Sequence, residues 1–466
     1  MLEKFIKNRI LNALPFAPNE GQVLLLEHLS QFVVSKTEKK AFVLRGYAGT
    51  GKTSIMAALV KALDELQQPV VLLAPTGRAA KVLAHYANKA AFTIHKYIYR
   101  QDKLGADSFS LSDNLHKHTL FIVDEASMIS GQRDNPTFGT GALLQDLIKY
   151  VYTGEGCSML LLGDDAQLPP VGSEASPALD VDYLLGYGLA VKSHSLTQVA
   201  RQALDSGILL NATHIRDHIA TSPRSALTYQ FSTDFQEFDG SEFLELLEKS
   251  YREVGMEDTI ILTRTNRRTN LYNQGIRARV LWKEDAVSSG DRLMISKNNY
   301  YWTKDYEGIP FLANGDMMEI VRLRNCREMY GFHFVDASLR AIDYDWEIDV
   351  MLWLDTLSTD SPEATHQLHS QLFDRISEDY PELQHNRKKL IETIYESPYY
   401  NALQVRFAYA VTCHKAQGGQ WKRVFIDTGN ISAEQKDINY YRWLYTAVTR
   451  ASQQVYLLKT NAKIEK

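Results

Sequence analysis

The sequence predicts an α/β protein with two parallel-sheet domains in tandem, residues 1–205 and 206–466. Three observations support this prediction. A chain of 466 residues is too long to fold around one hydrophobic core. Through its first half, short apolar runs alternate with helical segments, a pattern typical of a parallel sheet covered on both faces. A second series of apolar runs begins at Thr259.

Four apolar runs of the first domain are expected to form buried strands. They are Ala41–Leu44, Val70–Leu73, Leu120–Val123 and Met159–Leu162. Each run ends in small or polar residues. Ligands of open α/β sheets bind outside the carboxyl ends of the strands, so we expect these four endings to face one site.

The second domain is expected to be interrupted by an insertion. Its strands are predicted at Thr259–Thr263, Val405–Val411, Val424–Ile426 and Val455–Leu458. The front of the insertion is rich in β-type residues and punctuated by glycine, and its back, Ser361–Glu396, is charged with a helical pattern. A shorter insertion, Tyr97–His118, separates two strands of the first domain and favours a hairpin.

Composition excludes several classes of protein. No apolar run reaches the roughly 18 residues that a membrane-spanning helix needs. Cys157, Cys326 and Cys413 are too scattered for a disulfide framework or a zinc cluster, which predicts a reducing, cytoplasmic setting. The net charge of −5 argues against binding nucleic acid over the whole surface, but not against gripping one strand in a lined channel.

The strongest motif is a glycine-rich loop between a predicted strand and the helix that starts near Ser54. Its glycines let backbone N–H groups turn toward phosphate oxygens, and the helix N-terminus adds a positive dipole. Lys52 is expected to reach the β- and γ-phosphates, and Thr53 to ligate Mg²⁺. The nucleotide-binding residues are therefore predicted to be Gly46, Ala48, Gly49, Thr50, Gly51, Lys52, Thr53 and Ser54.

Two acidic residues after the third apolar run complete this predicted site. Asp124 is expected to hold Mg²⁺ through water. Glu125 is placed to polarise the attacking water, which predicts a hydrolase rather than a kinase. After the fourth run, Gln167 is a candidate contact to the γ-phosphate.

Arg201 and Arg450 are candidates to stabilise the charge that develops during phosphoryl transfer. Arg450 belongs to the second predicted domain, so its participation would place ATP in a cleft between the two domains.

The motifs, taken in order, resemble the superfamily 1 DNA helicases, specifically the RecD-like, Dda-like branch. The matching pieces are Asn19–Gln22, the glycine-rich loop, Ala74–Lys81, Thr93–Lys96, Asp124–Glu125, Gly163–Pro170, Leu196–Gln202, Asn314–Asp316, Thr412–Gly418 and Tyr445–Arg450. The forms Gln167-Leu-Pro-Pro and His414-Lys-Ala-Gln-Gly resemble the branch that moves 5′-to-3′.

This resemblance implies two RecA-like motor domains that use ATP and Mg²⁺ to translocate on single-stranded DNA and unwind forked or tailed duplexes. It implies a strand-separating pin at 97–118, with Phe109 as a candidate tip, and a small β-barrel at about 316–400. Gln22 would read the adenine. Contacts to the strand, mostly to phosphate and sugar, would come from Thr76, Arg78, Thr93, His95, Thr412, His414 and Lys415.

Two other functions stay open at this point. The chain could be an ATP switch or structural subunit of a DNA recombination or DNA repair complex that unwinds nothing alone. It could also be an RNA helicase, because no residue identified here reads a 2′-hydroxyl. A monomer is expected, with a single-strand-binding protein or a repair complex as a candidate partner and no membrane. Phe109 could equally anchor its hairpin to its own domain.

Overall fold

The computed structural model describes residues 2–101, 108–133, 137–199, 205–221, 227–306, 309–432 and 435–459. These residues form two compact units. The first unit contains the chain up to Asp239 and also the segment from Ala416 onward, whereas the second contains Gly240–Lys415. The motifs that follow Lys415 therefore belong to the same compact unit as the glycine-rich loop.

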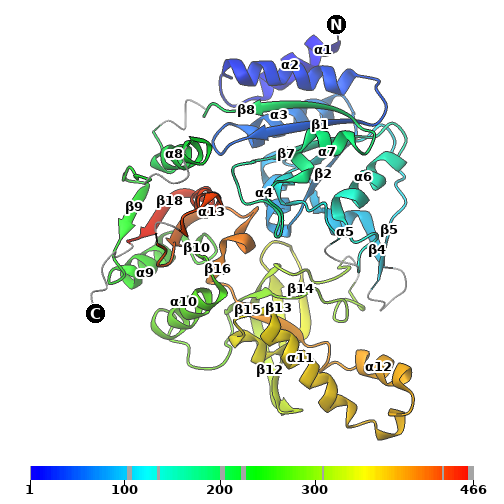
Figure 1. Ribbon diagram of the computed structural model, residues 1–466, viewed down its shortest axis with the longest axis vertical. Coiled ribbons are helices and arrows are strands. Elements are labelled where there is room, and N and C mark those ends of the chain that lie inside the picture. The colour runs from blue at the N-terminus through cyan, green and yellow to red at the C-terminus, as the bar shows by residue number, and fades with distance from the viewer. Residues whose placement is uncertain are drawn as a thin grey trace. The chain divides into compact units, whose positions relative to one another are not determined.

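A six-stranded parallel sheet forms the centre of the first unit (Figure 1). Its strand order is β3-β2-β6-β7-β1-β8. The four predicted apolar runs are confirmed as strands of this sheet. The other two strands do not appear as apolar runs in the sequence, because β3 has only three residues and the edge strand β8 is largely polar and exposed. The bounds are β1 (Lys40–Gly46), β2 (Val70–Ala74), β3 (Ala91–Thr93), β6 (Leu120–Val123), β7 (Ser158–Gly163) and β8 (Ala190–Leu196).

Helices cover both faces of this sheet, so the central strands β6 and β7 are buried along their whole length. Phe42 and Leu44 of β1 and Leu160 of β7 are buried in a core with the helices of one face. Those helices are α1 (Leu2–Ala13), α2 (Glu20–Val34), α3 (Lys52–Glu65) and α4 (Gly77–Ala87). On the other face, Phe121 packs edge-to-face on Tyr150. The helices of that face are α5 (Ile94–Ile98) and α6 (Leu143–Thr153).

The short insertion of the first unit forms the predicted hairpin. Strands β4 (Tyr99–Gln101) and β5 (Phe109–Leu111) pair in antiparallel fashion. The segment that connects them lies outside the described residues. The hairpin follows α5 directly along the chain and is thereby joined to the sheet that carries the glycine-rich loop.

The rest of the first unit combines elements from both sides of the second unit in sequence. Strands β9 (Phe235–Phe238), β17 (Trp421–Asp427) and β18 (Ala451–Leu458) form a parallel ladder with β18 in the middle. Helix α13 (Ile438–Val448) packs against α8 (Gly207–Thr221). The short helix α7 (Val181–Leu185) precedes β8.

The second unit opens with α9 (Phe243–Val254), β10 (Thr259–Thr263) and α10 (Asn266–Arg279), and β10 pairs in parallel with β16 (Ala410–Thr412). The prediction of a single strand at Val405–Val411 is wrong. This segment contains the end of one strand, β15 (Leu403–Phe407), and then a separate strand, β16. The amide of Asn273 explains the break. It donates to the carbonyls of Phe407 and Ala410 and accepts from the N–H groups of Tyr409 and Ala410.

The predicted barrel is confirmed as a closed five-stranded barrel. Its first and last strands lie outside the predicted span of 316–400. The charged segment behind the barrel forms two helices that bury apolar residues, including Leu372 and Ile394, against the barrel residues Phe334 and Trp353. The bounds are β11 (Arg292–Ile295), β12 (Met317–Met329), β13 (Phe332–Ala341), β14 (Glu347–Trp353) and β15, with α11 (Pro362–Ser377) and α12 (Arg387–Tyr395).

Candidate nucleotide site and strand-contact residues

The carboxyl ends of β1, β6 and β7 surround one cavity of about 380 Å³ in the first unit. Residues of the glycine-rich loop line it together with Asp124, Glu125, Asp164 and Gln167. The segments Gly418–Gln420 and Thr449–Ser452 line it as well. The structure thus gathers the predicted nucleotide-contacting motifs, which are far apart in sequence, around a single cavity.

The glycine-rich loop has the backbone geometry that its sequence requires. Gly49 and Gly51 have φ angles of 74° and 85°, in the left-handed region that side chains disfavour. Helix α3 begins directly after the loop, at Lys52. The Lys52 ammonium donates to the carbonyls of Gly46 and Tyr47. Thr53 and Ser54, in the first turn of α3, line the cavity.

Gln22 ties helix α2 to this loop. Its Oε1 accepts a 2.9 Å hydrogen bond from the backbone N–H of Asn19, which completes a capping box at the start of α2. Its Nε2 donates to the carbonyl of Thr50, also at 2.9 Å. An amide oxygen has a second lone pair and an amide nitrogen a second hydrogen, so Gln22 keeps one acceptor and one donor for a base edge.

The acidic pair stands directly after β6. Burial, and next the negative charge of Glu125, raise the pKa of Asp124 to about 6. The Asp124 Oδ1 atom accepts a 2.8 Å hydrogen bond from the Glu125 N–H. Glu125 has a φ angle of 50°, an unusual backbone conformation for a residue with a side chain. Such strain is concentrated at functional sites, where it fixes the direction of a side chain.

Arg450 reaches this acidic pair from the C-terminal segment. Its Nη1 atom lies 3.4 Å from Glu125 Oε1 and donates to the Gly419 carbonyl at 3.2 Å. Its Nε atom donates to the carbonyl of Thr446 at 3.1 Å. The side chain is only 4% exposed, so protein atoms hold the guanidinium in one orientation at the cavity.

A buried network joins helix α13 to the segment after β7. The Tyr445 hydroxyl donates to Asp164 Oδ2 at 2.7 Å and accepts from the Ala48 N–H at 2.9 Å. Thr446 Oγ1 accepts from the Leu168 N–H at 2.9 Å. Tyr445 was not singled out from the sequence, although its place in the same motif as Arg450 was an available signal.

Gln167 lies beside this network at the edge of the cavity. Its side chain is 7% exposed, and its Oε1 atom is buried without a hydrogen-bond partner in the part of the chain that the structure describes. A buried amide oxygen without a partner costs free energy unless a ligand or water satisfies it. Arg201, the other predicted arginine, lies outside the described residues.

The predicted strand-contact residues of the first unit all have partners within the protein. Thr76 caps helix α4 and Thr93 caps helix α5 through their hydroxyl oxygens. The Arg78 guanidinium lies 4.9 Å from the centre of the Trp421 ring. His95 packs edge-to-face on Phe138, and burial lowers its pKa to about 4. Its neutral ring can contact sugar or base, whereas it offers no positive charge to a phosphate.

Phe109 is buried at 3% exposure and packs on Phe138 with ring centres 4.9 Å apart. The structure therefore supports the second of the two interpretations of this residue, an anchor that fixes the hairpin to its own unit.

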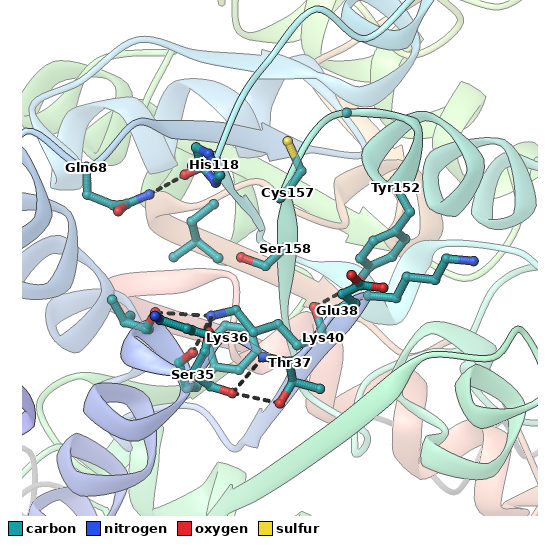
Figure 2. A pocket seen from close by; sticks show the side chains of 16 residues that line it. Ser35, Lys36, Thr37, Glu38, Lys40, Gln68, His118, Tyr152, Cys157 and Ser158 are labelled. Carbon is teal, nitrogen blue, oxygen red and sulfur yellow. Dashed lines mark hydrogen bonds between the residues drawn. The ribbon is translucent and has the colours of Figure 1, made fainter.

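A second cavity of the first unit, about 620 Å³, lies at the opposite edge of the sheet, next to the amino ends of β1, β2, β6 and β7 (Figure 2). Lys40 is one of the lysines that line it, and its ammonium donates to the carbonyls of Phe32 and Val33 at the end of α2, at 2.7 and 3.0 Å. This lysine caps a helix, so the cavity lacks the phosphate-binding arrangement found at the carboxyl edge.

In the second unit, Thr412 and Lys415 line a common cavity, and His414 is exposed next to Lys415. The Lys415 ammonium lies 2.6 Å from Asn314 Oδ1, which joins two of the motifs of the resemblance. Among the described residues, no helix is long and apolar enough to cross a membrane.

A glycine-rich phosphate loop, an acidic strand end and a distant arginine around one cavity define a nucleotide hydrolase of the RecA-like type. Comparisons with known proteins extend this. A family model described as an AAA domain matches residues 19–229, and a model described as a UvrD-like helicase C-terminal domain matches residues 407–458. Both matches agree with the resemblance to superfamily 1 helicases of the branch that includes RecD and Pif1.

Individual relatives differ in how much of the chain they cover. An uncharacterized protein of Acanthamoeba polyphaga mimivirus is 24% identical over 94% of this chain and 99% of its own length. The ATP-dependent RecD2 DNA helicase of Deinococcus radiodurans is 30% identical over 41% of this chain, which spans only 24% of that helicase. The crystal structure of Bacteroides Pif1 bound to single-stranded DNA covers 95% of this chain and 92% of its own, with 15% identity and a TM-score of 0.48.

Proposed function

We propose that this chain hydrolyses ATP to translocate 5′-to-3′ on single-stranded DNA and to unwind duplex DNA. The observation that carries the proposal is the meeting of the Lys52 loop, Glu125 and Arg450 at one cavity. A cation from the C-terminal segment facing a phosphate loop can couple hydrolysis to movement of the parts that hold the strand. The direction is supported by the resemblance of the motifs to the branch that moves 5′-to-3′.

The pairing of Glu125 with Arg450 suggests how the γ-phosphate triggers the site. A γ-phosphate competes with Glu125 for the guanidinium, because charge-assisted bonds from arginine to phosphate are strong. Glu125 is then released to polarise the attacking water, while Arg450 stabilises the developing charge. The γ-phosphate is thus the contact that distinguishes the two states of the motor, as a ligand-driven population shift requires.

Mg²⁺ fits the residues that surround the loop. The described residues contain no group of three or more His, Cys, Asp or Glu side chains that could hold a metal by themselves. Mg²⁺ in such sites is held by one or two protein groups together with substrate phosphates. Thr53 and Asp124 would hold the ion, which would neutralise phosphate charge. Burial, followed by the charge of Glu125, raises the pKa of Asp124, and a bound cation would oppose that shift.

Partners and setting belong to the same proposal. Forked and tailed duplexes are the expected DNA structures, with a single-strand-binding protein or a repair complex as a candidate partner. A monomer suffices, because the first unit alone supplies Lys52, Glu125 and Arg450. A cytoplasmic setting is supported by the free cysteines Cys157, Cys326 and Cys413. Residues 1–205 and 206–466 remain the proposed motor domains.

ATPase assays with no nucleic acid, with single-stranded DNA and with single-stranded RNA test the proposal. We expect DNA to stimulate hydrolysis several-fold more than RNA. Lys52→Ala should abolish hydrolysis and retain strand binding. Stimulation by RNA alone would favour the RNA helicase, and hydrolysis that no nucleic acid stimulates would contradict the translocation proposal.

A further inference from the structure

A cavity of about 430 Å³ in the second unit concentrates positive charge in a chain whose net charge is −5. Lys297, Arg406 and Lys415 line it, and none of its described lining residues is acidic. The three cations come from different elements: Arg406 from barrel strand β15, Lys297 from the segment after β11, and Lys415 from the turn after β16. Like charges are brought together here by the fold and not by neighbouring sequence.

Arg406 is the most informative of the three. In the described part of the chain its guanidinium makes no hydrogen bond and no ion pair, although it is only partly exposed. Burial lowers its pKa, and the negative charge of Asp360 opposes that shift. A partly desolvated guanidinium without a hydrogen-bonded partner is costly, and an anion in the cavity offsets that cost.

Lys415 experiences the same positive surroundings. The Lys415 side chain lines the cavity and is exposed to solvent. Burial by the surrounding protein, followed by the charge of Arg406, lowers its pKa to about 8. Its hydrogen-bond partner is Asn314, through a neutral amide oxygen. An anion near both side chains would favour their charged forms and would be held by both of them.

Helix α11 closes the cavity with neutral polar groups. Thr365, in its second turn, and His369 both line the cavity. His369 packs on Tyr400 with ring centres 4.3 Å apart, and burial lowers its pKa to about 4, so it is neutral at neutral pH. The Thr365 hydroxyl donates within the protein, toward Thr359 Oγ1 and the Ser361 carbonyl, so these side chains close the cavity without adding charge. This placement gives the charged helical segment a position at a ligand-binding surface.

We propose that this cavity binds consecutive phosphates of single-stranded DNA, with Arg406 and Lys297 as strand contacts that no sequence motif identifies. The inference rests on the proposed function and extends it. The cavity also holds Thr412 and Lys415, the strand contacts implied by the resemblance. It has no glycine-rich loop and no carboxylate to hold a magnesium-bound triphosphate, which favours a nucleic-acid backbone over a free nucleotide.

Binding of an oligo(dT) strand as a function of salt concentration tests this site. Each phosphate contact to single-stranded DNA contributes about 0.7 to the slope of log K against log salt. Arg406→Gln and Lys297→Gln should each reduce the slope by about 0.7 and weaken binding on the order of tenfold at moderate salt. Arg406→Lys should retain the slope, because it retains the charge.

Lys388→Gln is the matched control, because Lys388 lies on α12 with its side chain 89% exposed. It should leave the slope unchanged. If Arg406→Gln does not reach the wild-type melting temperature, Lys297→Gln decides. Wild-type slopes in well-folded Arg406→Gln and Lys297→Gln would overturn the site. Inorganic phosphate at matched ionic strength should displace little DNA, and full displacement would instead indicate a site for the free anion. Failure of the wild-type chain to bind oligo(dT) would contradict the proposed function itself.

Discussion

The Tyr445 hydroxyl joins Asp164 to the glycine-rich loop, since it donates to Asp164 Oδ2 at 2.7 Å and accepts from the Ala48 N–H. Burial raises the pKa of Asp164, and the Tyr445 hydroxyl is among the groups that oppose this shift. Tyr445 belongs to the helix that leads to Arg450. Through this one hydroxyl, the helix is hydrogen-bonded both to the glycine-rich loop and to the segment after β7 that contains Gln167.

Tyr445→Phe should lower kcat for ATP hydrolysis about tenfold and change the KM for ATP much less. Loss of the hydroxyl leaves a buried carboxylate and a loop N–H without this partner, which costs about 1–3 kcal/mol. Arg450, just after the end of the same helix, is then held less firmly in position. Steady-state kinetics measure both constants. Tyr441→Phe is the control, because Tyr441 lies on the same helix and is also buried, where it packs on His218. Equal effects of the two substitutions would contradict a specific role for Tyr445.

Arg450→Lys should retain ATP binding but lose hydrolysis by a factor on the order of a thousand. Lysine keeps the charge near Glu125 but lacks the planar guanidinium, whose Nη1 reaches Glu125 and the Gly419 carbonyl while its Nε donates to the Thr446 carbonyl. Binding of a fluorescent ATP analogue and single-turnover hydrolysis separate the two effects. Near wild-type turnover in this variant would remove Arg450 from the catalytic step.

Gln22→Ala should raise the KM for ATP more than the KM for GTP. The amide retains one acceptor and one donor beyond its bonds to Asn19 and Thr50, enough to read an adenine edge. Asn19→Ala is the control, because it removes the cap of α2 without removing the Gln22 amide. A parallel rise for both nucleotides in Gln22→Ala would show that the residue only supports the loop.

His369 should make stability fall as the pH decreases from about 6.5 to about 4. Its folded-state pKa of about 4 is below the ordinary value near 6.5, so the unfolded chain binds the proton more readily in this window. Asp124, with its raised pKa, acts in the opposite direction. We therefore compare variants: the urea midpoint of His369→Gln should fall less between pH about 7 and about 5 than that of wild type. Identical falls would contradict the buried neutral histidine.

Most of the first unit could be predicted because its central strands are apolar runs that end in recognisable motifs. β1, β2, β6 and β7 carry this signal. The edge strand β8 does not, because one side of an edge strand faces solvent and its side chains are polar. The break between β15 and β16 depends on the Asn273 side chain, more than 130 residues earlier in sequence. No local pattern could reveal that contact.

The candidate site also contains some residues that local sequence predicts and others that only tertiary contacts reveal. The loop, Asp124 and Glu125 follow from spacing alone, because one strand end carries each group. The hydrogen bonds of Tyr445 and the clustering of Arg406 with Lys415 depend on tertiary contacts. Phe109 illustrates the opposite case, where an apolar residue with two interpretations was resolved by its packing on Phe138.

Unwinding of two duplexes that differ only in whether the single-stranded tail is 5′ or 3′ tests the central claim most directly. The measurement is strand release over time with ATP and Mg²⁺, with Lys52→Ala as the inactive control. We predict rapid release from the 5′-tailed duplex, little from the 3′-tailed duplex and none by Lys52→Ala. Release from neither duplex despite DNA-stimulated ATPase activity, or preferential release from the 3′-tailed duplex, would contradict the account.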